Sequence, residues 1–242
     1  MILGAIPARW GSTRFPGKAL AEIAGRPLVG WVVEAALDAR TLDAVVVVTD
    51  HDEIARAAEV AGGRAVVIAR EADSGTDRIA QLLAADRTCA AAQIVVNVQG
   101  DEPLLEPSAI DAAVDALERE PDADIATLAR PIRAGESAED PSIVKVAVTG
   151  AGRALYFSRA PIPYGGAPRV HVGLYAYRRS AFDRFVTATP TTLEKAERLE
   201  QLRALELGLA ITVVQFDSRS IGVDTPEDVA RVETVLSRAS ER

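Results

Sequence analysis

The sequence predicts an α/β protein with a doubly wound, mostly parallel sheet and a smaller mixed β lobe. Continuous apolar runs alternate with helical patterns through the first half of the chain. Such runs are typical of strands that helices cover on both faces. The second half contains strand-like runs with few helices between them, which indicates a meander or a smaller sheet. No internal repeat, linker or low-complexity tract divides the 242 residues. We therefore expect one continuous domain over residues 1–242, with the lobe around 130–190.

The first half alternates strand and helix. We expect strands at 2–7, 44–48, 65–68 and 94–98, and helices at 27–40, at 52–61, from about 74 or 76, and at 107–120. The first helix begins at Pro27, a residue that suits the first helical turn, and carries apolar residues at helical spacing. Ligands of parallel sheets bind beyond the carboxyl ends of the strands. The loops after 2–7, 44–48 and 94–98 are therefore expected on one ligand-binding edge.

The second half is expected to contain more strands than helices. Its expected strands are 125–132, 144–148, 154–158 and 172–177, and a helix at 192–207, a strand at 210–216 and a helix at 225–238 follow. Thr225 is a natural N-cap for the last helix, and Pro226 suits its first turn.

Composition excludes several classes of protein. The chain is 48% hydrophobic and 26% charged, as in an ordinary globular protein. No apolar run approaches the roughly 18 residues of a membrane span, and no basic segment opens a signal peptide, so we expect a cytoplasmic protein without a membrane partner. The single cysteine, Cys89, excludes an internal disulfide and a cysteine-built metal site. A net charge of -8 argues against nucleic-acid binding.

A glycine-bracketed loop, GSTRFPGK at 11–18, follows the first expected strand. It is not a P-loop, because its second glycine comes one residue late and Ala19 replaces the hydroxyl that binds Mg²⁺ there. Glycine lets backbone N–H groups approach a phosphate, and Arg9, Arg14 and Lys18 bring three cations within ten residues. The loop is therefore predicted to bind phosphate groups.

Two loops far apart in the sequence each carry a candidate metal-binding carboxylate. Asp101 lies in QGDEP, after the strand at 94–98, and Asp224 lies in GVDTPED. Each acid alone also suits a turn or a helix start. Because Thr225 can cap the last helix, Asp224 is not needed for capping. Mg²⁺ binds one or two protein carboxylates and completes its octahedron with water and phosphate oxygens. The pair therefore predicts a Mg²⁺ site.

The motifs together resemble the 3-deoxy-manno-octulosonate cytidylyltransferase (CMP-Kdo synthetase) family, which has a Rossmann-like nucleotidyltransferase fold. The matching segments, in order, are 6–9, 12–18, 49–50, 74–78, 98–103, 156–160, 199–203 and 222–228. The resemblance implies that CTP and an eight-carbon ulosonic acid react, with Mg²⁺, to give a CMP-sugar and pyrophosphate for lipopolysaccharide biosynthesis. It also implies a homodimer, with the sugar-binding and dimerisation lobe around 130–190.

The resemblance implies a role for each matching residue. The residues that it places in catalysis are Arg14, Lys18, Asp101 and Asp224, of which Asp101 and Asp224 are the metal ligands. The residues that it places along the nucleotide are Arg9, Arg14, Lys18, Ser74, Arg78 and Gln99, with Ser74 and Gln99 near the ribose and base. The residues that it places around the sugar acid are Arg159, His171, Tyr175, Glu200 and Gln201. The general base is either metal-bound solvent or a carboxylate.

Other interpretations of these residues stay open. Arg159 also fits a surface ion pair, Glu200 a solvated helix face and His171 a structural hydrogen bond. Residues 165–170 are fewer than the family usually carries there, which keeps another acidic acceptor open: an amino-modified octulosonate, a nine-carbon sialic-type acid or a phosphonate. A non-catalytic nucleotide-binding module is the other alternative, and the presence of both candidate metal ligands speaks against it.

Overall fold

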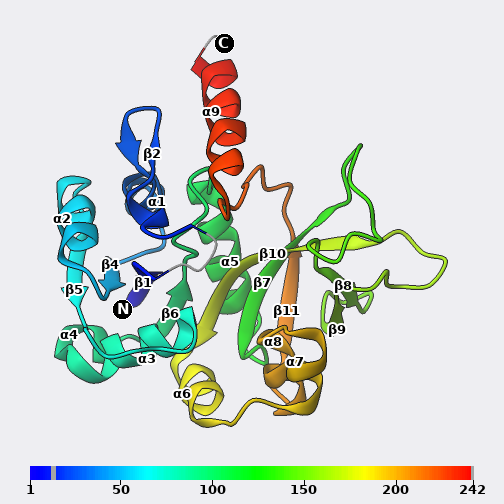
Figure 1. Ribbon diagram of the computed structural model, residues 1–242. Coiled ribbons are helices and arrows are strands. Elements are labelled where there is room, and N and C mark those ends of the chain that lie inside the picture. The colour runs from blue at the N-terminus through cyan, green and yellow to red at the C-terminus, as the bar shows by residue number, and fades with distance from the viewer. Residues whose placement is uncertain (12–14, 241–242) are drawn as a thin grey trace. The chain divides into compact units, whose positions relative to one another are not determined.

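The computed structural model describes residues 1–11 and 15–240. The chain forms two compact units, each with its own core. The first unit comprises Met1–Ile110 and Arg219–Arg242, and the second comprises Asp111–Ser218. The first unit is therefore discontinuous in sequence, since the chain leaves it, builds the second unit and returns. Figure 1 labels the helices and strands of both.

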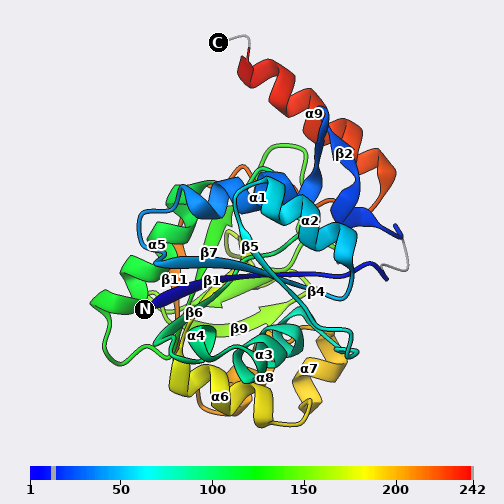
Figure 2. The ribbon, with the colours of Figure 1, turned by 90° about the vertical axis from the view of Figure 1, so that its left-hand side faces the viewer.

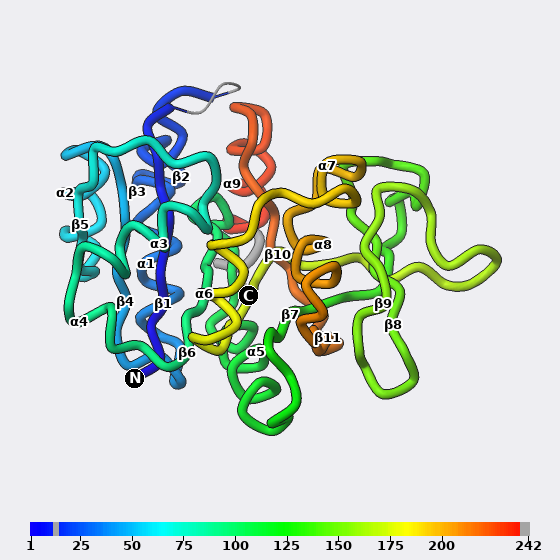
Figure 3. Tube along the Cα trace, turned by 90° about the horizontal axis from the view of Figure 1, so that it is seen from below, coloured from blue at the N-terminus to red at the C-terminus, as the bar shows by residue number. Residues whose placement is uncertain are grey.

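A parallel sheet forms the centre of the first unit. Its strands, in spatial order, are β6 (Ile94–Asn97), β1 (Ile2–Ala8), β4 (Ala44–Thr49) and β5 (Arg64–Val67). Figure 3 shows these strands side by side. Consecutive residues of β1 and β4 are buried, so both faces of these strands are covered. These four parallel strands confirm the parallel sheet that the four apolar runs predicted. The sequence analysis missed a short antiparallel hairpin of β2 (Glu22–Ile23) and β3 (Arg26–Pro27).

Helices cover both faces of this sheet. The helices of the first unit are the 3₁₀ helix Lys18–Leu20, α1 (Leu28–Leu37), α2 (Asp52–Val60), α3 (Gly75–Ala85), α4 (Arg87–Ala90) and α9 (Pro226–Ser240). Helices α1 and α2 lie on one side of the strands and α3 and α4 on the other (Figure 2). This arrangement confirms the doubly wound fold. Helix α5 (Pro107–Arg119) begins in the first unit and ends in the second.

The second unit contains a mixed sheet. Its strands, in spatial order, are β11 (Ile211–Gln215), β7 (Ile125–Pro131), β10 (Arg169–Arg178), β8 (Lys145–Val148) and β9 (Ala154–Ser158). Strand β11 runs parallel to β7, and the other three pairings are antiparallel. The predicted mixed β lobe is confirmed by this sheet.

The predicted helix at 192–207 is wrong as a single element. The chain forms α6 (Arg179–Thr187), then α7 (Thr192–Glu197) and, after an interruption, α8 (Gln201–Glu206). The interruption falls at Arg198, which has a left-handed φ of 55°. The carbonyl oxygen of Arg198 accepts a hydrogen bond from Arg159 Nη2 at 3.3 Å, so a contact with a distant segment accompanies the break.

Helix α9, with 15 residues, is the longest of the described elements. Over residues 1–11 and 15–240, no helix combines the length and the apolar character that crossing a membrane requires.

Candidate active site

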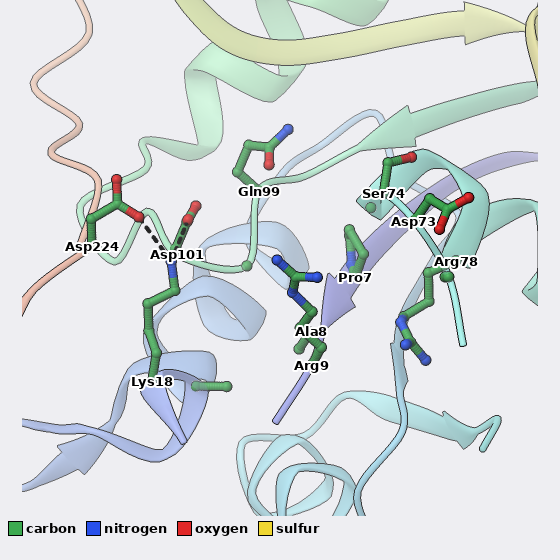
Figure 4. A pocket seen from close by; sticks show the side chains of 14 residues that line it. Pro7, Ala8, Arg9, Lys18, Asp73, Ser74, Arg78, Gln99, Asp101 and Asp224 are labelled. Atoms are coloured by element: carbon green, nitrogen blue, oxygen red, sulfur yellow. Dashed lines mark hydrogen bonds and ion pairs between the residues drawn. The ribbon is translucent and has the colours of Figure 1, made fainter. Parts of the chain in front are cut away.

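A pocket of about 300 Å³ opens at the carboxyl ends of β1 and β6, within the first unit. Figure 4 shows its lining side chains. The lining residues are Pro7, Ala8, Arg9, Lys18, Ala19, Ala72, Asp73, Ser74, Gly75, Arg78, Gln99, Gly100, Asp101 and Asp224. This set contains every residue that the sequence analysis placed at the nucleotide or the metal except Arg14, which lies outside the described residues. The pocket lies at the expected ligand-binding edge of the sheet.

Two glycines allow the walls of the pocket to approach β1. A Cβ atom at Gly100 would lie 2.6 Å from the carbonyl oxygen of Pro7, and one at Gly75 would lie 3.1 Å from the Pro7 ring. Any other residue at position 100 would therefore push the loop after β6 away from β1. Where two backbone segments approach this closely, only glycine fits without strain.

The ammonium of Lys18 joins the two predicted metal ligands. Its Nζ lies 2.7 Å from Oδ2 of Asp101 and 3.3 Å from Oδ1 of Asp224 (Figure 4). Lys18 opens the 3₁₀ helix, directly after Gly17, whose φ of 71° lies in the left-handed region that favours glycine. Two carboxylates from loops far apart in sequence thus face one cation.

Three hydrogen bonds hold the loop after β6 against the segment that leads to α9. The backbone N–H of Val223 donates to the carbonyl of Asp101 at 2.9 Å, and the hydroxyl of Ser220 donates to the carboxylate of Glu102 at 2.7 Å. The backbone N–H of Arg219 donates to the carboxylate of Glu106 at 3.0 Å. Burial raises the pKa of Glu102 to about 7, against the lowering effect of the Ser220 hydrogen bond. These contacts fix the separation of the two candidate metal ligands.

The donor set fits Mg²⁺. Among the described residues, no group of three or more His, Cys, Asp or Glu side chains could hold a metal by itself. Mg²⁺ does not need such a cage, because water and substrate phosphates complete its octahedron. Asp101 and Asp224 supply two carboxylate oxygens that already converge on a single positive charge, the Lys18 ammonium.

Arg78 is a buried anchor of the pocket wall. Only 4% of its side chain is exposed, and its guanidinium donates to Oδ2 of Asp50 and to the carbonyl of Ile68, each at 3.2 Å. The other oxygen of the Asp50 carboxylate accepts the backbone N–H of Trp10 at 2.9 Å. Arg78 therefore supports, through Asp50, the backbone of Trp10, directly before the loop that is predicted to bind phosphate. In contrast, the Arg9 guanidinium points into the pocket (Figure 4).

Ser74 combines a structural role with its place in the pocket. Its Oγ accepts the backbone N–H of Asp77 at 3.1 Å and so caps α3. This cap brings the N-terminus of an 11-residue helix to the pocket wall. The sequence analysis missed the neighbouring Asp73, an exposed lining residue. Its signal was its position directly before a helix cap at the ligand-binding edge.

Arg159, in the second unit, is not a surface ion-pair residue. Its guanidinium donates to the backbone carbonyls of Glu197 at 2.9 Å, Pro141 at 2.8 Å and Arg198 at 3.3 Å. These bonds use three of the five N–H donors of a guanidinium. The remaining donors suffice for the carboxylate of a ligand. The bond to the carbonyl of Arg198 lies at the break after α7, so one of the contacts that hold Arg159 also accompanies this break.

His171 lies in an aromatic cluster of the second unit. Its ring contacts Phe157 edge to face at 5.0 Å and Tyr175 at 5.3 Å between centroids, and its Nε2 lies 2.9 Å from the hydroxyl of Thr127. Burial lowers the pKa of His171 to about 3. The imidazole is therefore neutral near pH 7 and can offer a hydrogen bond but no positive charge.

Glu200 and Gln201 lie at the start of α8, close to the break at Arg198. Gln201 is buried, with 8% of its surface exposed. Burial raises the pKa of Tyr177, and the negative charge of Glu200 raises it further. Glu200 is half-buried, and its charge acts on a phenol that contacts Tyr175.

Comparisons with known proteins identify the family of the chain. Residues 3–211 match the family profile described as Cytidylyltransferase. The chain is 50% identical over 238 residues to the 3-deoxy-manno-octulosonate cytidylyltransferase of Anaeromyxobacter dehalogenans, with 96% of each chain covered. It is 46% identical over 246 residues to the protein of the same name from Bdellovibrio bacteriovorus, with 98% of each chain covered.

A solved structure is also similar. The CMP:2-keto-3-deoxy-manno-octonic acid synthetase complexed with CTP superposes with a TM-score of 0.91 at 36% sequence identity. The match covers 98% of this chain and 99% of that chain. With a fold, a pocket and relatives that agree over almost the whole length, the chain belongs to the 3-deoxy-manno-octulosonate cytidylyltransferase family.

Proposed function

We propose that this protein transfers the CMP group of CTP to 3-deoxy-manno-octulosonate and releases pyrophosphate. The observation that carries the proposal is the convergence of Lys18, Asp101 and Asp224 in a pocket at the carboxyl edge of the sheet. This pocket belongs to a chain that is 50% identical to an enzyme of that name. The alternative of a module that only binds nucleotides gives no reason for two converging carboxylates.

The reaction needs no covalent enzyme intermediate. The anomeric hydroxyl oxygen of the sugar forms a bond to the α-phosphorus of CTP, while the bond from that phosphorus to the bridging oxygen breaks. Pyrophosphate leaves with the electron pair of that bond, and the hydroxyl proton passes to a base or to solvent. Catalysis of this kind consists of alignment and charge neutralisation.

The residues of the pocket suit the nucleotide. Arg9 points into the pocket, and both Arg9 and Lys18 can donate to phosphate oxygens. Ser74 and Gln99, from different walls, are assigned to the ribose and base. Arg14 stays part of the proposal as a further phosphate ligand outside the described residues.

Asp101 and Asp224 are proposed to hold Mg²⁺. A bound Mg²⁺ would neutralise phosphate charge during the reaction. Because both carboxylates face Lys18 in this structure, the residues that bind the metal also orient a cation toward the pocket.

The second unit is proposed to bind the sugar acid. The remaining N–H donors of Arg159 suit its carboxylate, and neutral His171 and the phenol of Tyr175 suit its hydroxyls. Glu200 and Gln201 can accept and donate further hydrogen bonds. The homodimer, the cytoplasmic location and a role in lipopolysaccharide biosynthesis belong to the same proposal, which membership of the family supports.

The test is an acceptor and nucleotide profile of the purified protein with Mg²⁺. Pyrophosphate release and the mass of the CMP-sugar are measured with 3-deoxy-manno-octulosonate, its amino-modified analogue, a sialic-type acid and a phosphonate. We expect 3-deoxy-manno-octulosonate with CTP to give the highest kcat/KM. A higher kcat/KM for another acid would identify that acid as the acceptor. A higher kcat/KM for ATP or GTP than for CTP would overturn the proposal.

A further inference from the structure

Lys145, the first residue of β8, is a buried cation that is held by backbone carbonyls. None of its side chain is exposed. Its ammonium donates to the backbone carbonyls of Asp140 at 3.0 Å, Ile143 at 2.7 Å and Arg159. Within the described part of the chain, no carboxylate oxygen lies within ion-pair distance of this nitrogen. An ammonium has three donors, and all three are used.

Burying a charged ammonium costs free energy of folding, which the hydrogen bonds of the ammonium must offset. Burial lowers the pKa of Lys145, and the charges of Asp140 and Glu139 oppose that effect. A methionine or leucine would fill a buried site of this size without the cost of burying a charge. The importance of Lys145 therefore lies in the backbone groups that it holds.

Those groups surround Arg159. The ammonium holds the carbonyl of Arg159 itself and, through Asp140 and Ile143, the turn between them. The guanidinium of Arg159 donates to the carbonyl of Pro141, inside that same turn. One buried cation thus fixes both the backbone of Arg159 and one acceptor of its side chain.

A second set of contacts fixes the opposite side of Arg159. The carboxylate of Glu197 accepts the backbone N–H of Arg159 at 2.9 Å and the hydroxyl of Ser158 at 2.7 Å. The carbonyl of Glu197 accepts Arg159 Nε at 2.9 Å. The guanidinium is therefore held by the end of α7 on one side and by the turn at 140–143 on the other. Without Lys145, the turn would keep its bond from the Arg159 guanidinium to Pro141 but would lose the ammonium that joins it to the backbone carbonyl of Arg159.

We propose that Lys145 is a positioning residue of the sugar-acid site, which orients the remaining N–H donors of Arg159 toward the carboxylate of the acidic sugar. The inference rests on the proposed function, because that function assigns Arg159 to the sugar acid. Lys145 itself touches neither substrate in this proposal.

The test compares Lys145→Met with a matched control in the same unit. The guanidinium of Arg178 also donates to three backbone carbonyls, those of Ala123, Leu117 and Glu120. Arg178→Met therefore also removes a cation that holds three backbone carbonyls, and none of these carbonyls is an acceptor of Arg159. Melting temperatures and the KM values for CTP and for 3-deoxy-manno-octulosonate are measured for both variants, well below their melting temperatures.

For Lys145→Met we expect the KM for the sugar acid to rise about tenfold or more, the effect of one misplaced hydrogen bond to a charged group, with an unchanged KM for CTP. For Arg178→Met we expect lower stability with unchanged KM values. In the double variant Lys145→Met/Arg159→Ala, the sugar-acid KM should be no higher than in Arg159→Ala alone, because Lys145 acts through Arg159.

An unchanged sugar-acid KM in Lys145→Met would overturn the inference, as would equal effects in Arg178→Met or additive effects in the double variant. If Lys145→Met does not fold, Lys145→Gln, which keeps two N–H donors but no charge, is compared with Arg178→Met in the same way. Wild-type turnover tests the proposed function separately: no turnover of 3-deoxy-manno-octulosonate would refute that function, whereas turnover with an unaffected Lys145→Met would refute only the positioning role.

Discussion

Lys18 and Asp101 form the shortest contact between charged groups in the pocket, with 2.7 Å between Nζ and Oδ2. Asp224 shares the same ammonium at 3.3 Å. Two carboxylates so close together would repel each other without a cation between them. Lys18 therefore offsets one of the two negative charges, and a divalent ion held by both acids would compete with it for the same oxygens.

This competition predicts an unusual effect of Lys18→Met on metal binding. We expect affinity for Mn²⁺, used in place of Mg²⁺, to rise in the absence of CTP, because no ammonium occupies the carboxylates. Turnover should fall by about 10²-fold or more, because a cation next to the phosphates is lost. Isothermal titration with Mn²⁺ measures the first effect, with Lys195→Met as the exposed-lysine control. Equal Mn²⁺ affinities in wild type and variant would contradict the competition.

Replacement of either acid should mainly affect catalysis. Asp101→Asn and Asp224→Asn are each expected to lower turnover by about 10³, or roughly 4 kcal/mol of barrier, because the phosphates lose neutralisation. The double variant should be little worse than either single variant, since the residues act as a unit. In metal-free protein, Asp101→Asn should lower the melting temperature more than Asp224→Asn, because Asp101 has the shorter contact with Lys18.

Pyrophosphate release and melting temperature, each followed over a Mg²⁺ titration, test this prediction for all three variants. Full activity of Asp224→Asn at ordinary Mg²⁺ would exclude a shared metal ion.

Loss of the Ser220 hydroxyl should weaken metal binding by Asp101 and Asp224 only mildly. Ser220→Ala removes the donor to Glu102 while the backbone bond between Val223 and Asp101 stays. Because the separation of the carboxylates is then less fixed, we expect the Mg²⁺ concentration for half-maximal activity to rise severalfold. Ser180→Ala, at an exposed position, is the control. An unchanged Mg²⁺ requirement would show that the backbone bond alone fixes the pair.

Burial of His171 predicts a pH dependence of stability. The pKa of His171 is about 3 in the folded protein and near 6.5 in an unfolded chain. Between these values the unfolded state binds more protons, so the free energy of unfolding falls as pH falls from 6.5 toward 3. The loss is at most about 1.4 kcal/mol per pH unit. Urea denaturation at several pH values between 7.5 and 4.5 gives the free energy of unfolding at each pH. This free energy should change less with pH in His171→Gln than in the wild type, and an equal pH dependence would contradict the buried neutral imidazole.

The sequence predicted the first unit well, because continuous apolar runs indicate strands that are covered on both faces. It also placed the loops that carry Lys18 and Asp101 on one edge, because loops at the carboxyl ends of parallel strands share an edge, and it paired Asp101 with Asp224 as candidate ligands of one Mg²⁺. The contacts of the Lys18 ammonium with both acids were not predicted. The break at Arg198 could not be predicted, since the residue is neither glycine nor proline and the contact with Arg159 comes from a segment distant in the sequence. Lys145 gave no signal either: its three acceptors are backbone carbonyls, which every sequence contains.

The discontinuity of the first unit has a consequence for biosynthesis. The ribosome makes Lys18 and Asp101 early, but Asp224 emerges only after the whole of the second unit. Because domains fold as they leave the ribosome, the second unit can form while the first still lacks its last segment. A nascent chain that stalls before Arg219 therefore has Lys18 and Asp101 without their third partner. Synthesis of the segment that contains Asp224 thus completes the candidate site, and products truncated before Arg219 are expected to be inactive.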